Sequence, residues 1–330
     1  MGASAQPADF SPAPVVRSFA WAMLAALLGF LINNYLTVNL SWPGISPLFS
    51  AAAGTTTQSW IQLAIYIALF GIAIIYALKS SGRSLRADAT RISGYSAYLI
   101  RAAFWAVLLV GVADAAISFL RVEGMLEVFF SPDIATQLGR SLYRGPTVHI
   151  PLILLGAVIA LFTRSLGFVW LTLLIVVAEL SIVITRFIFS YEQAFMGDLV
   201  RFWYAALFLF ASAYTLLEDG HVRVDVFYAS FKPRTKGFVN AWGAIFLGLS
   251  VCWVILIVGM GGRSSIINSP MLNYEVSQSG FGMYTKYLMA GFLAVFAITM
   301  LIQFVSQLLE SVADWRDEPG KRIVAEGMPH

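Results

Sequence analysis

Charged residues are scarce in this sequence. Lys, Arg, Asp and Glu make up 12% of its 330 residues, whereas hydrophobic residues make up 59% and the mean hydropathy is +0.78. A soluble domain of ordinary composition has about 25% charged residues, so this chain has too little polar surface to face water on all sides. The composition excludes an ordinary soluble globular protein and predicts an all-α integral membrane protein.

Cysteine and histidine are also nearly absent. The single cysteine, Cys252, lies in an apolar run, which excludes a disulfide framework and a cysteine-based metal site. Of the three histidines only His149 comes near a membrane segment, at its end, and a bis-histidine haem site needs two. We therefore expect no cofactor, no metal and no enzymatic activity. The basic residues are spread among loops and form no patch, so we expect no nucleic-acid partner.

Eight apolar segments have, or nearly have, the ~20 residues that cross ~30 Å of hydrocarbon. The fourth is the shortest and is separated from the fifth only by Arg164 and Ser165, so it could instead be the first half of one long kinked helix. The segments are Ser18–Leu40, Trp60–Leu78, Ala102–Leu120, Val148–Thr163, Leu166–Ser190, Phe195–Leu217, Phe238–Gly259 and Tyr284–Leu309.

The distribution of lysine and arginine favours eight crossings. With eight spans and the N-terminus inside, roughly two thirds of the 21 basic residues fall on the cytoplasmic side. If the fourth segment did not cross, the basic loops Lys79–Arg101 and Arg223–Lys236 would face opposite compartments. The positive-inside rule therefore predicts eight transmembrane helices with both termini in the cytoplasm. The longest outside connection, Arg121 to His149, has an apolar pattern that predicts a helix lying in the membrane interface.

Some of the predicted spans contain ionisable residues away from their first turn. Glu179 is near the middle of the fifth span, and Arg186 follows seven residues later on the same helical face. A carboxylate at that depth is expensive, so Glu179 is either an ion or proton relay or a polar anchor for a neighbouring helix or a partner subunit. Asp114 lies in the third span, where we expect it to pair with a neighbouring helix.

Two further groups of polar residues form a recognisable pattern. Asp198 and Arg201 begin the sixth span, one turn apart, and a charged loop follows that span directly. The loop contains Glu218, His221, Arg223 and Asp225, and a basic stretch, Lys232-Pro233-Arg234-Thr235-Lys236, comes soon after it.

This pattern resembles the small permease subunit of tripartite ATP-independent periplasmic (TRAP) transporters, over roughly Leu166 to Leu309. Members usually carry two adjacent acids where this chain has Gly197 and Asp198, so any role that depends on the acid pair is in doubt. The resemblance divides the chain into an extra four-helix membrane module (1–165), a four-helix small-permease unit (166–310) and a cytoplasmic tail (311–330).

The resemblance implies a non-catalytic, multi-pass subunit in a bacterial inner membrane, surrounded by lipid. In that family a large permease subunit carries the substrate and sodium sites, and a periplasmic binding protein delivers the organic acid that is taken up. The small subunit supports the scaffold of the large one. The candidate subunit-contact or structural residues are then Glu179, Arg186, Asp198, Arg201, Glu218, His221, Arg223 and Asp225.

Two other functions stay open on the sequence. An autonomous transporter or channel would need a polar pathway, for which the spans offer little beyond Asp114, Glu179, Asn33, Asn34 and Gln303. A membrane enzyme or haem-binding anchor would need ligands that the spans do not supply.

Overall fold

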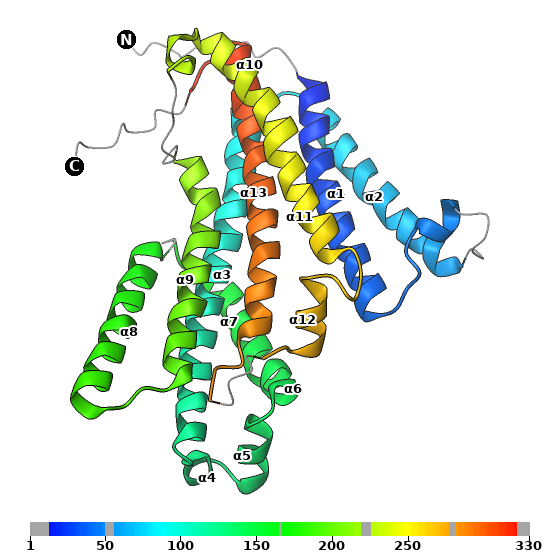
Figure 1. Ribbon diagram of the computed structural model, residues 1–330. Helices are drawn as coiled ribbons and strands as arrows, with labels where there is room; N and C mark the ends of the chain where they lie inside the picture. The colour runs from blue at the N-terminus through cyan, green and yellow to red at the C-terminus, as the bar shows by residue number, and fades with distance from the viewer. Residues whose placement is uncertain (1–12, 50–55, 165–166, 219–225, 277–280, 322–330) are drawn as a thin grey trace. The chain divides into compact units, whose positions relative to one another are not determined.

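The structure is a computed structural model of the full chain, and it describes residues 13–49, 56–164, 167–218, 226–276 and 281–321 (Figure 1). Within these ranges, eight helical stretches are long and apolar enough to cross a membrane. The predicted all-α class with eight spans is thereby confirmed, and the protein is a multi-pass membrane protein. The eight stretches are Pro14–Asn39, Thr57–Lys79, Leu85–Val122, Ser141–Phe162, Phe168–Phe189, Ala194–Leu217, Pro233–Met260 and Lys286–Trp315.

Two of the eight stretches contain a π-helical segment between two α-helices, and short helices occupy some of the connections. The elements are α1 (Pro14–Asn39), η1 (Ser46–Phe49), α2 (Thr57–Lys79), α3 (Leu85–Val122), α4 (Leu126–Phe129), α5 (Pro132–Leu138), α6 (Ser141–Arg144), η2 (Gly145–His149), α7 (Ile150–Phe162), α8 (Phe168–Phe189), α9 (Ala194–Leu217), η3 (Tyr228–Ser230), α10 (Pro233–Gly243), η4 (Ala244–Leu249), α11 (Ser250–Met260), α12 (Asn268–Asn273) and α13 (Lys286–Trp315).

The fourth span is longer than the sequence predicts. Its helix runs from Ser141 to Phe162, because the π-helical segment η2 joins α6 to α7 without a break. The sequence analysis places its start at Val148. Gly145 and Pro146, residue types that usually mark a turn, lie inside the observed helix. The 22 residues of this stretch are sufficient for a crossing.

We expect reporter fusions to give an eight-crossing topology with both termini in the cytoplasm. Fusions on the predicted cytoplasmic side should all report an inside location, and those on the opposite side an outside location. An inside signal at Ala52 together with an outside signal at Ser80 would contradict the scheme. An outside signal at Ser165, with every later site reversed, would remove only the fourth crossing. The inside sites are Ser80, Ser165, Ser230 and Glu318, and the outside sites are Ala52, Gly139 and Ser269.

The chain divides into two compact units. Unit 1 contains residues Met1–Tyr95, Thr215–Val254 and Met300–His330, and unit 2 contains Ser96–Tyr214 and Ile255–Thr299. Each unit therefore takes segments from both sides of the boundary predicted near residue 165. That boundary, which rests on the extent of the family resemblance, stays a prediction.

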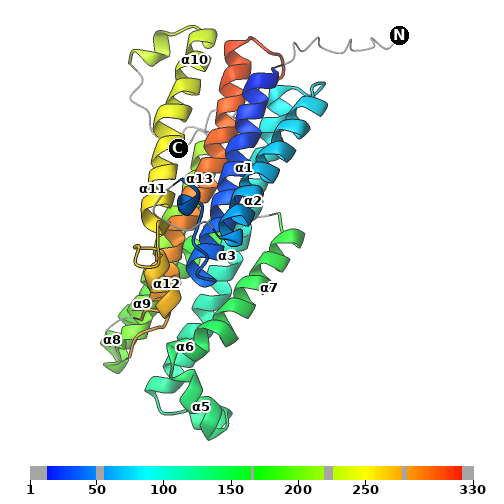
Figure 2. The same cartoon turned by 90° about the vertical axis from the view of Figure 1, so that its right-hand side faces the viewer.

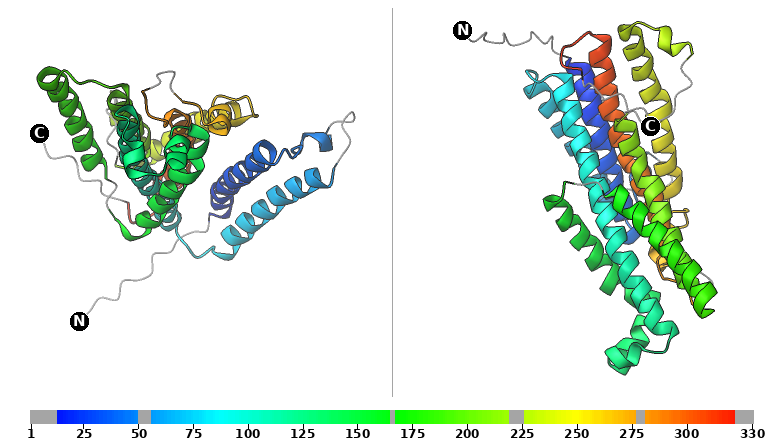
Figure 3. Two further views of the ribbon diagram at one scale, coloured as in Figure 1. Left: turned by 90° about the horizontal axis from the view of Figure 1, so that it is seen from below. Right: turned by 90° about the vertical axis from the view of Figure 1, so that its left-hand side faces the viewer.

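In unit 1, α1 and α2 lie side by side (Figures 1 and 3). A side chain at Gly29 of α1 would come within 2.7 Å of the ring of Tyr66 on α2, so the glycine permits this close approach. Gln62 of α2 is fully buried; its amide nitrogen donates to the Thr37 hydroxyl at 3.1 Å and its oxygen accepts from the backbone N–H of Gly44 at 2.9 Å. Small and polar contacts of this kind hold membrane helices together, since apolar contact with lipid is equally favourable.

Unit 1 also contains a buried ion pair between α1 and α3. Arg17 is 1% exposed, and its Nε lies 2.7 Å from a carboxylate oxygen of Asp88, which is fully buried. The remaining guanidinium N–H groups donate to the carbonyls of Ala77 and Ser80 and to the Ser80 hydroxyl. Trp21 donates to the same oxygen of Asp88 at 3.3 Å. Arg17 thus joins α1 both to α3 and to the end of α2.

Polar contacts join α3 to α13 within unit 1. Arg86 pairs with Glu310 at 2.6 Å and with Asp314 at 2.8 Å. Two turns further along α3, the hydroxyls of Ser93 and Ser306 lie 2.8 Å apart, both buried. The first part of α3 is therefore paired with α13.

In unit 2, α7 lies alongside α3 (Figure 2). A side chain at Gly156 would come within 2.6 Å of the backbone nitrogen of Ala106, so the two helix backbones touch at this point. On another side of α3, the Trp203 indole of α9 donates to the Val107 carbonyl at 3.3 Å. Helices α7 and α9 are thus both fixed to α3.

The connection from residue 121 to 149 differs from the single interfacial helix that the sequence predicts. It contains three short helices, α4, α5 and α6, in place of one. Leu126, Ala135 and Leu138 are buried together in a small apolar cluster. Val128 and Phe129, by contrast, are 73% and 62% exposed. Leu126 therefore serves the cluster, whereas Val128 and Phe129 face outward.

Candidate functional site

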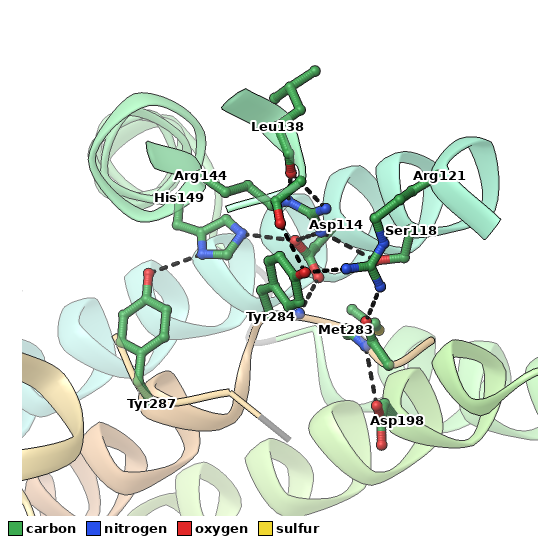
Figure 4. A network of polar contacts seen from close by, with 12 residues as sticks. Asp114, Ser118, Arg121, Leu138, Arg144, His149, Asp198, Met283, Tyr284 and Tyr287 are labelled. Atoms are coloured by element: carbon green, nitrogen blue, oxygen red, sulfur yellow. Dashed lines mark hydrogen bonds and ion pairs between the residues drawn. The ribbon is translucent and has the colours of Figure 1, made fainter. Parts of the chain in front are cut away.

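The most elaborate polar site of unit 2 is centred on Asp114, near the end of α3. Asp114 is fully buried, and both of its carboxylate oxygens are bonded (Figure 4). One oxygen lies 2.7 Å from Nη1 of Arg144 and 3.0 Å from Nε2 of His149. The other accepts the backbone N–H of Tyr284 at 2.7 Å. The sequence expectation that Asp114 pairs with a neighbouring helix agrees with this arrangement.

Arg144 is the principal counter-charge of Asp114. Its side chain is fully buried, and it also donates to the Ser118 hydroxyl at 3.1 Å and twice to the Leu138 carbonyl, at 3.0 and 2.8 Å. Its guanidinium carbon lies 4.2 Å from the centre of the Tyr284 ring. A buried cation is tolerated when its charge is paired and its N–H groups are bonded, and Arg144 meets both conditions.

The π-helical segment η2 places His149 at this site. A π-helical turn is rare in proteins and is often found at functional positions. It begins at Gly145, where a side chain would come within 2.2 Å of the Tyr274 ring, so only glycine lets that ring pack here. Arg144 and His149 are five residues apart, and the wider turn carries both to the same carboxylate oxygen.

His149 connects Asp114 to Tyr287 on α13. Its Nδ1 lies 2.8 Å from the Tyr287 hydroxyl, and the two rings are stacked with their centroids 5.8 Å apart. Nε2 faces a carboxylate, which accepts and cannot donate, so Nε2 carries a proton. In the neutral imidazole Nδ1 then accepts from the Tyr287 hydroxyl. The three residues form one continuous line of hydrogen bonds.

A second arginine, Arg121 of α3, holds the segment that precedes α13. It donates to the Tyr284 hydroxyl and, at 2.7 Å, to the carbonyl of Gly282. The Tyr284 hydroxyl in turn donates to the Gly139 carbonyl at 2.9 Å. Tyr284 therefore lies between two guanidinium groups and is fixed through its ring, its hydroxyl and its backbone.

Asp198 of α9 binds the same segment. Its Oδ2 accepts the backbone N–H of Met283 at 3.0 Å (Figure 4), while its other oxygen lies 3.5 Å from Nη1 of Arg201. The Arg201 side chain is 77% exposed, so this pair contributes little on its own. Asp198 thus fixes the backbone of the segment before α13, and its predicted role as a subunit-contact or structural residue stays a prediction.

The other sequence candidates lie elsewhere. Arg186 pairs with Glu192 at 3.2 Å at the end of α8, with both side chains exposed. Glu179 lies on α8 and is also exposed, and Glu218 directly follows α9. His221, Arg223 and Asp225 lie outside the described residues, so their predicted role in subunit contact stays a prediction.

A pocket of about 260 Å³ lies where α8 turns into α9. Beside it in the chain, the Tyr191 hydroxyl donates to Glu123 at 2.6 Å. Burial and this hydrogen bond raise the pKa of Tyr191 to about 12, so it stays a protonated donor at neutral pH. The pocket is lined by Ile182, Glu192, Gln193, Ala194, Met196, Gly197, Asp198 and Arg201.

The sequence singled out Asp114 and Asp198 but not Arg121, Arg144, His149, Tyr284 and Tyr287. A signal was present, since Asp114, Ser118 and Arg121 recur at helical spacing on one face of the third span. The pairing of Arg144 and His149 with Asp114 was missed because Gly145 and Pro146 usually mark a turn and give no sign of a π-helical segment.

The chemistry of this site is that of a structural clamp. Its carboxylate is paired and every ring nitrogen and hydroxyl named above has a partner, so none is left to bind a ligand. Two guanidinium groups close to one carboxylate also disfavour a metal cation. Among the described residues no group of three or more His, Cys, Asp or Glu side chains could hold a metal ion.

Eight apolar helices and a buried clamp of this kind define a polytopic helical membrane protein. Residues 173–314 match the family model of the tripartite ATP-independent periplasmic transporters, DctQ component. Comparison with curated proteins and with solved structures gave no match. The resemblance to the TRAP small permease is confirmed for this part of the chain, and the extra helices lie before it.

The clamp joins the matched region to the helices that precede it. Asp198, Tyr284 and Tyr287 lie inside the matched residues, whereas Asp114 and His149 lie before them. Within unit 2, the helices that precede residue 173 are therefore joined by hydrogen bonds directly to the matched region.

Proposed function

We propose that this chain is the small membrane subunit of a TRAP-type secondary transporter in a bacterial inner membrane. In this role it supports the scaffold of a large permease subunit, which takes up an organic acid by ion-driven transport, with sodium as the coupling ion. A periplasmic binding protein delivers the substrate. The observation that carries the proposal is the match of residues 173–314 to the DctQ component.

The polar groups of the described spans support a scaffold role. The buried charges of α1, α3 and α6 pair with one another, as Arg17 does with Asp88 and Arg144 with Asp114. A transport pathway needs polar groups that can exchange partners with a substrate or an ion. The extra helices, fixed to the matched region by the Asp114 clamp, enlarge the scaffold in this proposal.

We expect the purified chain alone, in proteoliposomes under a sodium gradient, to take up no organic acid. Uptake should appear when the large permease subunit is co-reconstituted and the loaded binding protein is added, because the substrate and ion sites belong to the partner. The measurement is accumulation of radiolabelled substrate. Liposomes with the large subunit and binding protein but without this chain are the control. Sodium-driven accumulation by the isolated chain would instead make it an autonomous transporter.

A further inference from the structure

Helix α8 is covered by the rest of unit 2 along a narrow stripe only. Leu171 and Ile175 are its buried residues, and α8 lies beside α9 with its other side open (Figures 1 and 3). Large apolar side chains, Val176, Leu180 and Val183 among them, are 57%, 56% and 48% exposed. If these apolar side chains were the only residues on the exposed side of α8, contact with lipid would account for their exposure.

Glu179 lies on this exposed side of α8, and contact between its carboxylate and lipid is unfavourable. It is the twelfth of the 22 residues of α8, about 16 Å from the first residue of the helix, which is the middle of a hydrocarbon layer of ~30 Å. Its side chain is exposed, and within the part of the chain that the structure describes it has no ion pair and no hydrogen bond. A carboxylate in this position is among the most unfavourable groups to leave facing lipid.

Neighbouring polar groups on α8 do not compensate Glu179. Arg186 lies seven residues further along, about 10 Å away along the axis, and pairs with Glu192. The hydroxyls of Ser181 and Thr185 donate to carbonyls of their own helix. The compensating group must therefore come from outside α8.

We propose that the Glu179 side of α8 docks against a transmembrane helix of another subunit that presents a lysine or arginine at mid-depth. The proposal rests on the proposed function, in which that subunit is the large permease. Val176 and Val183 lie about one turn on either side of Glu179 and would supply the apolar contact around the ion pair.

A second copy of this chain fits this surface poorly. A two-fold contact brings the same patch of both copies together, so Glu179 would meet Glu179. Two carboxylates in a low dielectric repel strongly. Charge complementarity thus favours a different, basic partner helix.

The test uses the full chain co-expressed with the large permease subunit. A photo-crosslinking residue at Val183 should join this chain to the large subunit, whereas one at Leu154 on α7, which is more exposed than Val183 (62% against 48%), should not. Glu179→Lys should lower the amount of co-purified large subunit by more than about tenfold, because it places two cations together. Glu179→Gln can still accept a hydrogen bond but no longer balances the partner's cation, so it should lower co-purification by less than Glu179→Lys does, and the complex that forms should keep its uptake.

The controls separate the possible results. Glu127→Lys reverses an exposed acidic residue on α4 and should leave the complex intact. Glu179→Leu inserts readily into membranes and should also lose the large subunit. It therefore tests the proposal even if Glu179→Lys fails to insert into the membrane. Normal co-purification of the large subunit with both Glu179→Lys and Glu179→Leu would overturn the docking proposal. So would crosslinking of Val183 to a second copy of this chain, or a Glu179→Gln complex that assembles but shows no uptake. A wild-type chain that does not co-purify would instead refute the proposed function.

Discussion

Replacing Arg144 by methionine should destabilise the protein by roughly 3–5 kcal/mol, because it leaves the Asp114 carboxylate buried without its main counter-charge. The change also removes the donors to Ser118 and Leu138. The measurement is the midpoint of denaturation in detergent, followed by fluorescence-detected gel filtration. Lys286→Met is the matched control, since Lys286 pairs with Glu275 at 2.5 Å but both side chains are about half exposed; it should change stability by no more than ~1 kcal/mol.

The double variant sharpens this result. Asp114→Leu removes the carboxylate and leaves the buried Arg144 without its counter-charge. Each single change should therefore destabilise the protein strongly. The two changes combined remove both charges and should be less damaging than the sum of the single changes. Strict additivity of the three variants would show that the ion pair contributes nothing. Denaturation of the Arg144 variant at the same midpoint as Lys286→Met would contradict the clamp altogether.

Replacing Arg17 by methionine should have an effect of similar size in unit 1, roughly 3–5 kcal/mol. Asp88 depends heavily on Arg17, because one of its carboxylate oxygens is buried with no partner among the described residues and the other is shared only with Trp21. Arg17→Lys keeps the charge but cannot reproduce several directed N–H groups, so an intermediate loss is expected. The same denaturation assay measures both.

Arg83 provides the matched control for Arg17. It is exposed, lies just before α3, and donates to the hydroxyl of Tyr76 at 2.9 Å. Arg83→Met should lie within ~0.5 kcal/mol of the wild type, as surface substitutions generally do. An equal effect of the two methionine variants would refute a special role for the Arg17–Asp88 pair.

The spans could be predicted from sequence because lipid permits little else. Any chain segment in hydrocarbon must bond its own backbone groups, so a long apolar run becomes a helix. The fourth span was short in the prediction for a local reason: η2 continues the helix through Gly145 and Pro146 by widening one turn. Hydropathy and turn signals do not detect that widening.

The candidate site was predictable only in part. Asp114 stands out because a carboxylate inside a span needs a partner, but nothing in the sequence shows that a π-helical turn carries Arg144 and His149 to the same carboxylate oxygen. Asp198 was found through the family pattern, but its partner is the backbone N–H of Met283. Every residue other than proline has such an N–H, so the side chains in the sequence do not indicate which one Asp198 binds. Pairing between distant segments depends on packing, which periodicity does not encode.

The pairing of α3 with α13 has a consequence for biosynthesis. Arg86 and its partner Glu310 are separated by 224 residues, so at ~5–20 residues per second Arg86 is made about 10 to 45 s before Glu310. Ser93 and Ser306 are separated almost as widely. During that interval the growing chain holds Arg86 and Ser93 of α3 without these partners. Assembly of unit 1 is therefore completed only once α13 has been made, and a nascent chain that stalls before α13 exposes those groups to membrane quality control.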